Sequence, residues 1–215
     1  MGLSHRIPTT PWRAASTWSV RPRMIAPLFA GLVLFGLGEG LLVLSHLGAT
    51  PWTVFAQGVA RHAGISLGWA TALISVVVLG AWWPLRERPG FGTLANLVVI
   101  AAVLDLTATT IPPPSAVYVR SLFVIAAVIA IGMGSALYLT TGLGPGPRDG
   151  LMTSLHRRLG ISVVYIRVSL EVSVLAIGWF MGGTVGVGTA VFAATIGFSI
   201  GACLRGLEWI LARST

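Results

Sequence analysis

The sequence predicts an all-α polytopic membrane protein, with six transmembrane helices in two inverted three-helix repeats. The prediction rests on apolar runs long enough to cross a bilayer, on the placement of the arginines, and on an internal duplication. Of the 215 residues, 55% are apolar and 9% are charged, whereas soluble domains carry about 25% charged residues. This composition excludes a water-soluble domain.

Six apolar runs are predicted to cross the membrane, because about 20 helical residues span a hydrocarbon core of about 30 Å. The predicted spans are residues 27–46, 66–84, 92–111, 119–140, 162–181 and 188–210. Residues 1–23 carry arginines ahead of the first span, and we expect them to form a disordered basic cytoplasmic tail. The membrane part then divides into repeat 1 at 24–111 and repeat 2 at 112–210.

The arginines orient these spans. Placed on alternate sides, they collect on one face: Arg6, Arg13, Arg21, Arg23, Arg86, Arg88, Arg148, Arg157, Arg158, Arg205 and Arg213. The other face receives only Arg61 and Arg120, and Arg167 falls within the fifth span. Basic residues favour the cytoplasmic side. We therefore expect a multi-pass protein of the bacterial cytoplasmic (inner) membrane with both termini in the cytoplasm.

The two halves of the sequence match without gaps at an offset of 96 residues. The matched features include Gly36 with Gly132, Leu47-Gly48 with Leu143-Gly144, Pro51 with Pro147, Gly64-Ile65-Ser66 with Gly160-Ile161-Ser162, and Gly92-Thr93 with Gly188-Thr189. A fixed offset of this kind indicates duplication. Three crossings per half would make the second half start on the opposite side, which gives inverted repeats, an architecture known in transporters.

Each half also contains a segment too short and too polar to cross the membrane, residues 51–63 and 147–159. Thr50-Pro51 is a typical helix start, and Gly146-Pro147 repeats it after the turn that contains Gly144. Two interpretations stay open. The segments are either re-entrant helices whose N-termini bind an anion or a carboxylate, or amphipathic helices lying in the interface.

The stretch from Gly142 to Leu151, Gly-Leu-Gly-Pro-Gly-Pro-Arg-Asp-Gly-Leu, resembles the signature of the YczE/YyaS/YitT-like bacterial membrane proteins. Supporting stretches are Arg88-Pro89-Gly90-Phe91-Gly92-Thr93, Arg167-x-x-x-Glu171 and 182–189. Where other members often have Pro-Trp-Asp, this chain has Pro51-Trp52-Thr53. The resemblance covers about residues 27–205 and implies the fold, while it leaves the activity open.

Charged residues within the spans are the candidates for function, since a charge at mid-bilayer costs about 2.5–3.5 kcal/mol and usually faces a cavity or a partner. Glu39, Asp105 and Glu171 lie within predicted spans, and Arg167 stands four residues before Glu171. Three interpretations stay open: a static ion pair, a proton- or ion-coupled site, and direct binding of a solute by Arg167 or Arg148. The acids exceed the single intramembrane arginine, unless Arg148 reaches inward.

The duplication distinguishes residues that shape the fold from residues of the candidate site. Arg167 matches Thr71, Glu171 matches Ser75, Glu39 matches Ser135 and Asp105 matches Gly201, so the charges are not shared between the halves. Glycine pairs at four-residue spacing indicate close helix packing or a homodimer. These pairs are Gly36 and Gly40, Gly182 and Gly186, and Gly197 and Gly201.

Several functions are excluded or disfavoured by what the chain lacks. Cys203 is its only cysteine, no histidine pair has metal-binding spacing, and no lysine exists for a phosphate-binding loop. The net charge of +8 is spread between apolar runs rather than gathered on one face, which disfavours nucleic acid as a partner. We therefore expect no enzyme activity, no cofactor and no metal.

The sequence thus favours a small-solute secondary transporter or channel-like protein with its site between the two repeats. The predicted solute-binding residues are Arg148, Asp149, Arg167, Glu171, Gly144 and Gly146, and the predicted ion- or proton-coupling residues are Glu39, Asp105 and Glu171. The expected partners are the lipid bilayer, an unidentified small solute and a second copy of the chain. The alternative is a non-transporting scaffold or accessory protein that docks a cytoplasmic partner or anionic lipid.

Overall fold

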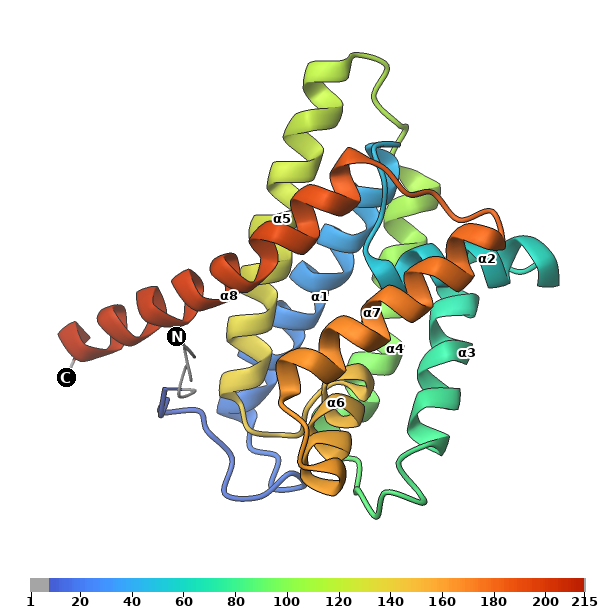
Figure 1. Cartoon of the computed structure of the whole chain (residues 1–215). Helices are drawn as coiled ribbons and strands as arrows, with labels where there is room; N and C mark the ends of the chain where they lie inside the picture. Colours follow the sequence, from blue (N-terminus) through green and yellow to red (C-terminus); the bar gives the residue numbers. More distant parts are fainter. Residues whose placement is uncertain (1–7, 215) are drawn as a thin grey trace.

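The computed structural model describes residues 8–214, which fold into eight helices without a strand (Figure 1). The helices are α1 (Pro22–Leu44), α2 (Pro51–Ala63), α3 (Leu67–Gly80), α4 (Phe91–Thr110), α5 (Val117–Thr140), α6 (Pro147–Leu159), α7 (Val163–Phe180) and α8 (Val187–Ser214). The all-helical membrane fold is therefore confirmed.

Five helices are long and apolar enough to cross a membrane: α1, α4, α5, α7 and α8. A sixth span is reached only if α2 and α3, bent by 110° at their junction, count together. The predicted span 66–84 is too long, because α3 ends at Gly80 after 14 residues. At 1.5 Å per residue that helix is about 21 Å long, short of the hydrocarbon core.

The early end of α3 is explained by Trp82. Its indole N–H donates to the carbonyl oxygen of Pro147 at 3.0 Å, and its ring is fully buried against Gly150 of α6. With the ring in this position, the chain after Gly80 turns toward α6 and does not continue the helix. The neighbouring Trp83 is exposed, as an aromatic residue at the membrane interface would be.

The helices of the two halves begin at matching positions, to within one residue. Pro51 and Pro147, and Phe91 and Val187, are 96 residues apart and begin equivalent helices. The loops match in their contacts as well: the amide of Gly92 donates to Leu143 at 2.8 Å, and the amide of Gly188 donates to Leu47 at 2.7 Å. Each loop thus packs against the last helix of the other half.

Helices α1 and α5 pack side by side at the centre of the fold (Figure 1). Gly31 and Gly134 let them approach, because a Cβ on Gly134 would lie 2.5 Å from the carbonyl oxygen of Gly31. Gly36 and Gly40 bring α1 close to Ile100, Val103 and Thr107 of α4, as predicted from their spacing. Gly197 of α8 differs, since nothing lies within 4 Å of its Cβ position.

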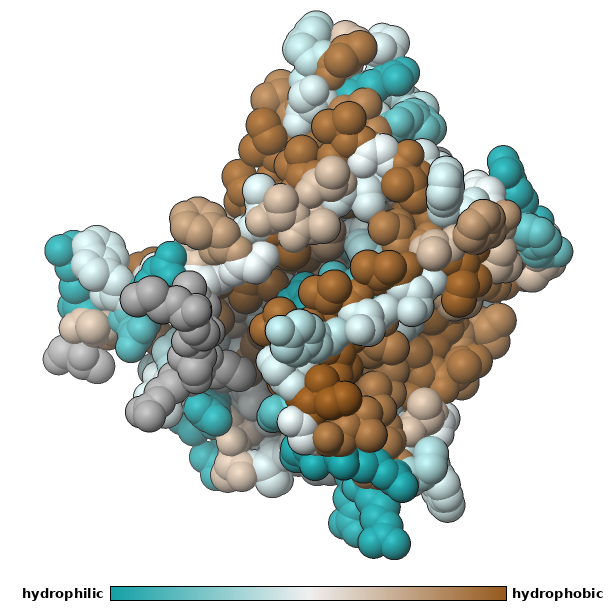
Figure 2. Space-filling view, in the orientation of Figure 1, coloured by the Kyte–Doolittle hydropathy of each residue, from teal (hydrophilic) through white to brown (hydrophobic). Residues whose placement is uncertain are grey.

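The halves also differ in one helix pair. Helix α3 packs on α4, whereas the equivalent helices α7 and α8 are not among the packed pairs. Helix α7 packs on α2 and α6, and α8 packs on α5 and then extends away from the bundle (Figure 1). Figure 2 shows a hollow on this face, with apolar walls and hydrophilic atoms at its base.

Residues 8–21 differ from the expected disordered tail. Ala14 donates its amide to the carbonyl of Thr141 at 2.7 Å, and Thr17 accepts from the amide of Phe91 at 3.0 Å. The indole N–H groups of Trp12 and Trp18 donate to Thr140 and Pro89. Hydrogen-bonding partners for these polar groups hold the segment against the ends of α4 and α5, and residues 22–23 already belong to α1. Residues 1–7 lie outside the described range.

Candidate functional site

A cavity of about 250 Å³ lies between the two halves. It is bordered by helices α1, α3 and α4 of the first half and by α5, α6, α7 and α8 of the second. Its polar lining consists of Thr71, Ser75, Asn96, Ser135, Tyr138, Arg148, Asp149 and Arg167, together with the backbone at Gly146. Its apolar lining includes Phe35, Ile100, Ile131, Phe192, Ile196 and Ile200.

The first turn of α6 forms one wall of this cavity. Gly146 is the N-cap and supplies no side-chain cap, and Pro147 occupies the first helical position. The amides at the start of a helix have no acceptor within it, and together with the helix dipole they favour an anion. Gly144 does not line the cavity; its φ of +117° and its contact with Thr93 require glycine there.

Arg148 reaches inward and pairs with Glu39. Its guanidinium donates to Oε1 of Glu39 at 3.2 Å and lies 5.2 Å from the centre of the Trp52 ring. Thr50, the N-cap of α2, donates to the same carboxylate oxygen at 3.4 Å. Glu39 is 1% exposed, and no partner for its Oε2 is found within residues 8–214. The starts of α2 and α6 therefore meet at one buried carboxylate.

Arg167 and Glu171 form the second ion pair, with Nε of the arginine donating to Oε1 of the glutamate at 2.9 Å. Arg167 lines the cavity, whereas Glu171 stands beside it one turn further along α7. Thr71 lines the cavity from α3; it is 2% exposed, and its hydroxyl has no hydrogen-bond partner within the described chain. The cavity thus contains a charged group and an unsatisfied polar group.

Asp149 is held by Tyr138 of α5. The phenol donates to Oδ2 of the aspartate at 2.5 Å, and both residues line the cavity. This bond links α5 to the first turn of α6 and fixes the orientation of the carboxylate. Asp149, Arg148, Arg167 and the Gly146 backbone therefore line one cavity, while Glu39 and Glu171 are the ion-pair partners of the two arginines.

Asp105 lies apart from the cavity. Its carboxylate accepts from the Ser66 hydroxyl at 3.0 Å and from the Gly68 amide at 2.8 Å, so that a side chain of α4 satisfies the start of α3. It borders an outer groove between these two helices. The geometry gives Asp105 a capping contact and no contact with the other predicted coupling residues.

The family of unknown function DUF6198 matches residues 22–205. The chain belongs to this family. An uncharacterized protein of Haemophilus influenzae is 46% identical over 89% of this chain and 88% of its own length. The uncharacterized membrane protein YczE of Bacillus subtilis is 32% identical over 87% and 90%, and YyaS of the same organism is 26% identical over 74% and 81%. No solved structure matches.

Membership of the DUF6198 family confirms the resemblance to YczE and YyaS, and the predicted membrane protein agrees with the name that YczE carries. At the position of the aspartate in the Pro-Trp-Asp pattern, Thr53 is fully buried and its hydroxyl lies 2.8 Å from that of Thr50. Its hydroxyl thus serves the start of α2. Only the second half carries an acid, Asp149, at this position of a short helix.

The residues of this DUF6198 site that escaped prediction include Tyr138, Thr71 and Trp52. The duplication could have indicated two of them, because they match predicted site residues of the other half. Thr71 is the equivalent of Arg167, and Trp52 is the equivalent of Arg148. Arg148 lies over the ring of Trp52, its match in the other half. Tyr138 had no such signal, because its match is Leu42.

Replacing Asp105 with alanine is expected to destabilise this DUF6198 protein by about 0.5–2 kcal/mol, the usual cost of removing a helix-capping oxygen. The loss arises because the Ser66 hydroxyl and the Gly68 amide both lose their acceptor. Unfolding of the purified protein in detergent, followed by tryptophan fluorescence, measures it. Unchanged stability, or a loss of solute binding at unchanged stability, would contradict the capping role.

Proposed function

We propose that the protein is a small-solute secondary transporter or channel-like protein, and that the central cavity binds an anionic solute. One observation carries the proposal: the cavity is bordered by helices from both halves and combines two arginines with the open start of α6. The unpartnered Thr71 hydroxyl offers a further donor. The proposal includes no enzymatic step and no cofactor.

The proposed coupling runs through Glu171. A solute anion at Arg167 competes with Glu171 for the guanidinium, and a carboxylate that loses its cationic partner favours the protonated form. Anion binding would then take up a proton. The other charged groups of the cavity have partners of their own, Arg148 with Glu39 and Asp149 with Tyr138, so that Glu171 is the acid that the solute would displace from its arginine.

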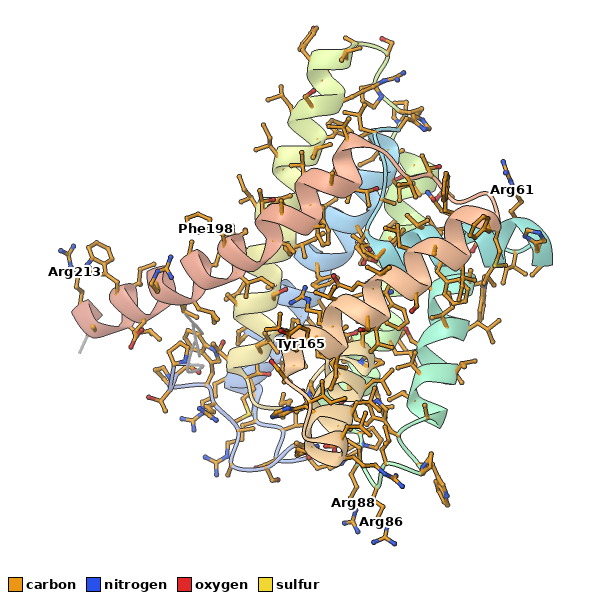
Figure 3. The ribbon with its side chains drawn as sticks, viewed as in Figure 1. Arg61, Arg86, Arg88, Tyr165, Phe198 and Arg213 are labelled. Carbon is orange, nitrogen blue, oxygen red and sulfur yellow. The ribbon has the colours of Figure 1, made fainter. Side chains whose placement is uncertain are left out.

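The proposed arrangement in the membrane is an inverted one. The reciprocal hydrogen bonds of the two loops and the equivalent helix starts support a two-fold relation between the halves. Arg86 and Arg88 project from the end of the molecule opposite Arg61 (Figure 3). This separation supports the proposal that the α3–α4 loop faces the cytoplasm, and the excess of arginines in the terminal segments places both termini on the same side in this proposal.

Solute binding can be tested by the thermal stability of the purified protein against a panel of short carboxylates and phosphate esters. We expect one class to stabilise the wild type, and Arg167→Gln to abolish the shift; a ligand at 100 times its Kd contributes about 2.7 kcal/mol. Arg157→Gln, which changes an arginine outside the cavity, is the matched control. No stabilising anion, or an equal loss in both variants, would contradict the proposal.

Proton coupling predicts that the affinity for this anion rises about tenfold for each unit by which the pH falls, since one proton is bound with each anion. Glu171→Gln is expected to remove this dependence and to keep binding. A wild type whose affinity is constant with pH would argue against Glu171 as the coupling residue.

The alternative proposal is a scaffold, and a basic groove outside the cavity favours it. The groove is lined by Arg86, Arg157 and Arg158 together with Pro84, Leu85 and Ser154. A soluble acidic partner or an anionic headgroup would fit its charge. In this case neutralising Arg157 and Arg158 would abolish the cellular function, whereas Arg167→Gln would leave it intact.

A further inference from the structure

We infer that the cavity opens sideways to the bilayer between α7 and α8, and that it takes a single-chain amphiphile with an anionic head. The inference rests on the proposed solute binding and narrows its substrate class. The head would lie at Arg167 and the start of α6, and the apolar chain would leave between the two helices.

The opening has a cause in the sequence. In the first half, Gly68 lets α3 touch α4, because a Cβ there would lie 2.6 Å from the carbonyl of Ala101, and Asp105 ties the two helices together. The equivalent positions of the second half hold Val164, Gly197 and Gly201. A branched side chain thus stands where glycine allowed contact, and the tying carboxylate is absent from this position.

The two helices that border the opening are anchored on their far sides. Gly178 of α7 packs against Val54 and Phe55 of α2, and Ser199 of α8 donates to the carbonyl of Val128 in α5 at 3.0 Å. Their facing sides remain uncovered, since Val164 is 66% exposed and Gly197 has nothing within 4 Å of its Cβ position. The gap is therefore held open by packing elsewhere.

The chemistry changes from the rim of the opening to its base. Tyr165 on α7 is exposed beside the gap, and Phe198 is exposed on the outer side of α8 (Figure 3), so that both helices face hydrocarbon in a membrane. Phe192, Ile196 and Ile200 continue this apolar surface inward along α8 to Arg167. Figure 2 shows the same order, with apolar walls above hydrophilic atoms.

The size of the cavity agrees with a ligand only part of which is enclosed. Its volume of about 250 Å³ lies below the roughly 300–1,000 Å³ of pockets that enclose a drug-sized ligand. An anionic head with a few methylenes fills it, and a longer chain must pass between α7 and α8. A fully water-soluble anion would gain no apolar contacts from an exit lined with apolar side chains.

The test uses the full chain in nanodiscs of phosphatidylcholine, with dodecanoate, butyrate and dodecyltrimethylammonium as probes and thermal stability as the readout. We expect dodecanoate to bind more tightly than butyrate and the cation not to stabilise. Gly197→Trp, which places a ring in the gap and leaves Arg167 in place, should weaken dodecanoate binding by about tenfold or more and spare butyrate. Each methylene removed from apolar contact costs about fourfold in affinity.

Each contrary result has its own meaning. Equal effects of Gly197→Trp on dodecanoate and butyrate would overturn the sideways opening and leave the proposed small-anion site standing. Failure of both anions to bind, with Arg167→Gln without effect, would instead contradict the proposed function. A dimer of the wild type that Gly197→Trp converts to a monomer would show that a second copy covers the gap, which also overturns the inference.

Discussion

Replacing Glu39 with glutamine is expected to lower the free energy of unfolding by about 3–5 kcal/mol, the cost of leaving a buried charge without its partner. Arg148 would keep its charge beside an amide, because arginine does not lose its proton in proteins. The start of α2 would also lose the ionised acceptor of the Thr50 hydroxyl. Unfolding in detergent with increasing denaturant, followed by tryptophan fluorescence, measures the change.

The reverse variant provides the control. Arg148→Gln leaves a buried carboxylate that can take up a proton and become neutral, so we expect it to cost less than Glu39→Gln. The double variant should recover part of the loss, because neither charge remains. An Arg148→Gln protein clearly less stable than Glu39→Gln, or a fully stable Glu39→Gln protein, would contradict the pairing as the structure has it.

Replacing Gly134 with alanine is expected to cost about 1–3 kcal/mol, the range for overpacking a tight interior. The new methyl group would lie 2.5 Å from the carbonyl oxygen of Gly31 and 2.8 Å from the amide nitrogen of Phe35. Both atoms belong to the backbone of α1, so no side chain can move aside and the central helices must separate. The same denaturant titration measures this loss.

Gly197→Ala is the matched control, a glycine-to-alanine change within a helix where nothing lies within 4 Å of the new atom. Alanine is preferred over glycine in helices by up to about 1 kcal/mol, so stability should hold or rise. If Gly134→Ala proved as harmless as Gly197→Ala, α1 and α5 would not approach as closely as described.

The short helices and the duplication were predictable because their signals are local or repeated. Proline at the first helical position and glycine at the C-cap mark α2 and α6 at both ends, and the structure places Pro51 and Pro147, and Gly64 and Gly160, at those positions. The long apolar runs likewise became helices, with ends within a few residues of the predicted ones at most positions.

The errors came from tertiary contacts that a sequence pattern does not contain. The second span was predicted to continue through Trp82 because tryptophan at the end of a span is typical of the membrane interface, and the sequence does not show its bond to Pro147. The tail at 8–21 looked polar and arginine-rich, yet its tryptophans and Thr10 find acceptors at the ends of other helices. In both cases a side-chain donor bonds to an acceptor far away in the sequence.

The charged residues of the candidate site were predictable from the sequence, but which of them lie together was not. An acid within an apolar run is conspicuous, so Glu39, Asp105 and Glu171 were selected together although Asp105 contacts α3 and not the cavity. The inward reach of Arg148 was only one of several open interpretations, and the fold decides it, because α6 begins beside α1 and α2. Thr71 carries no charge and escaped selection.

The most direct test of the central claim is the accessibility of a single cysteine in the cavity. Cys203 is the only cysteine, so Ser135→Cys in a Cys203→Ser background places one thiol between the halves. A transporter predicts labelling by a membrane-impermeant maleimide from each side of the membrane, and protection by the anion found in the stability panel. A thiol that neither side reaches, in a folded protein that retains its cellular function, would contradict a transport site between the two repeats.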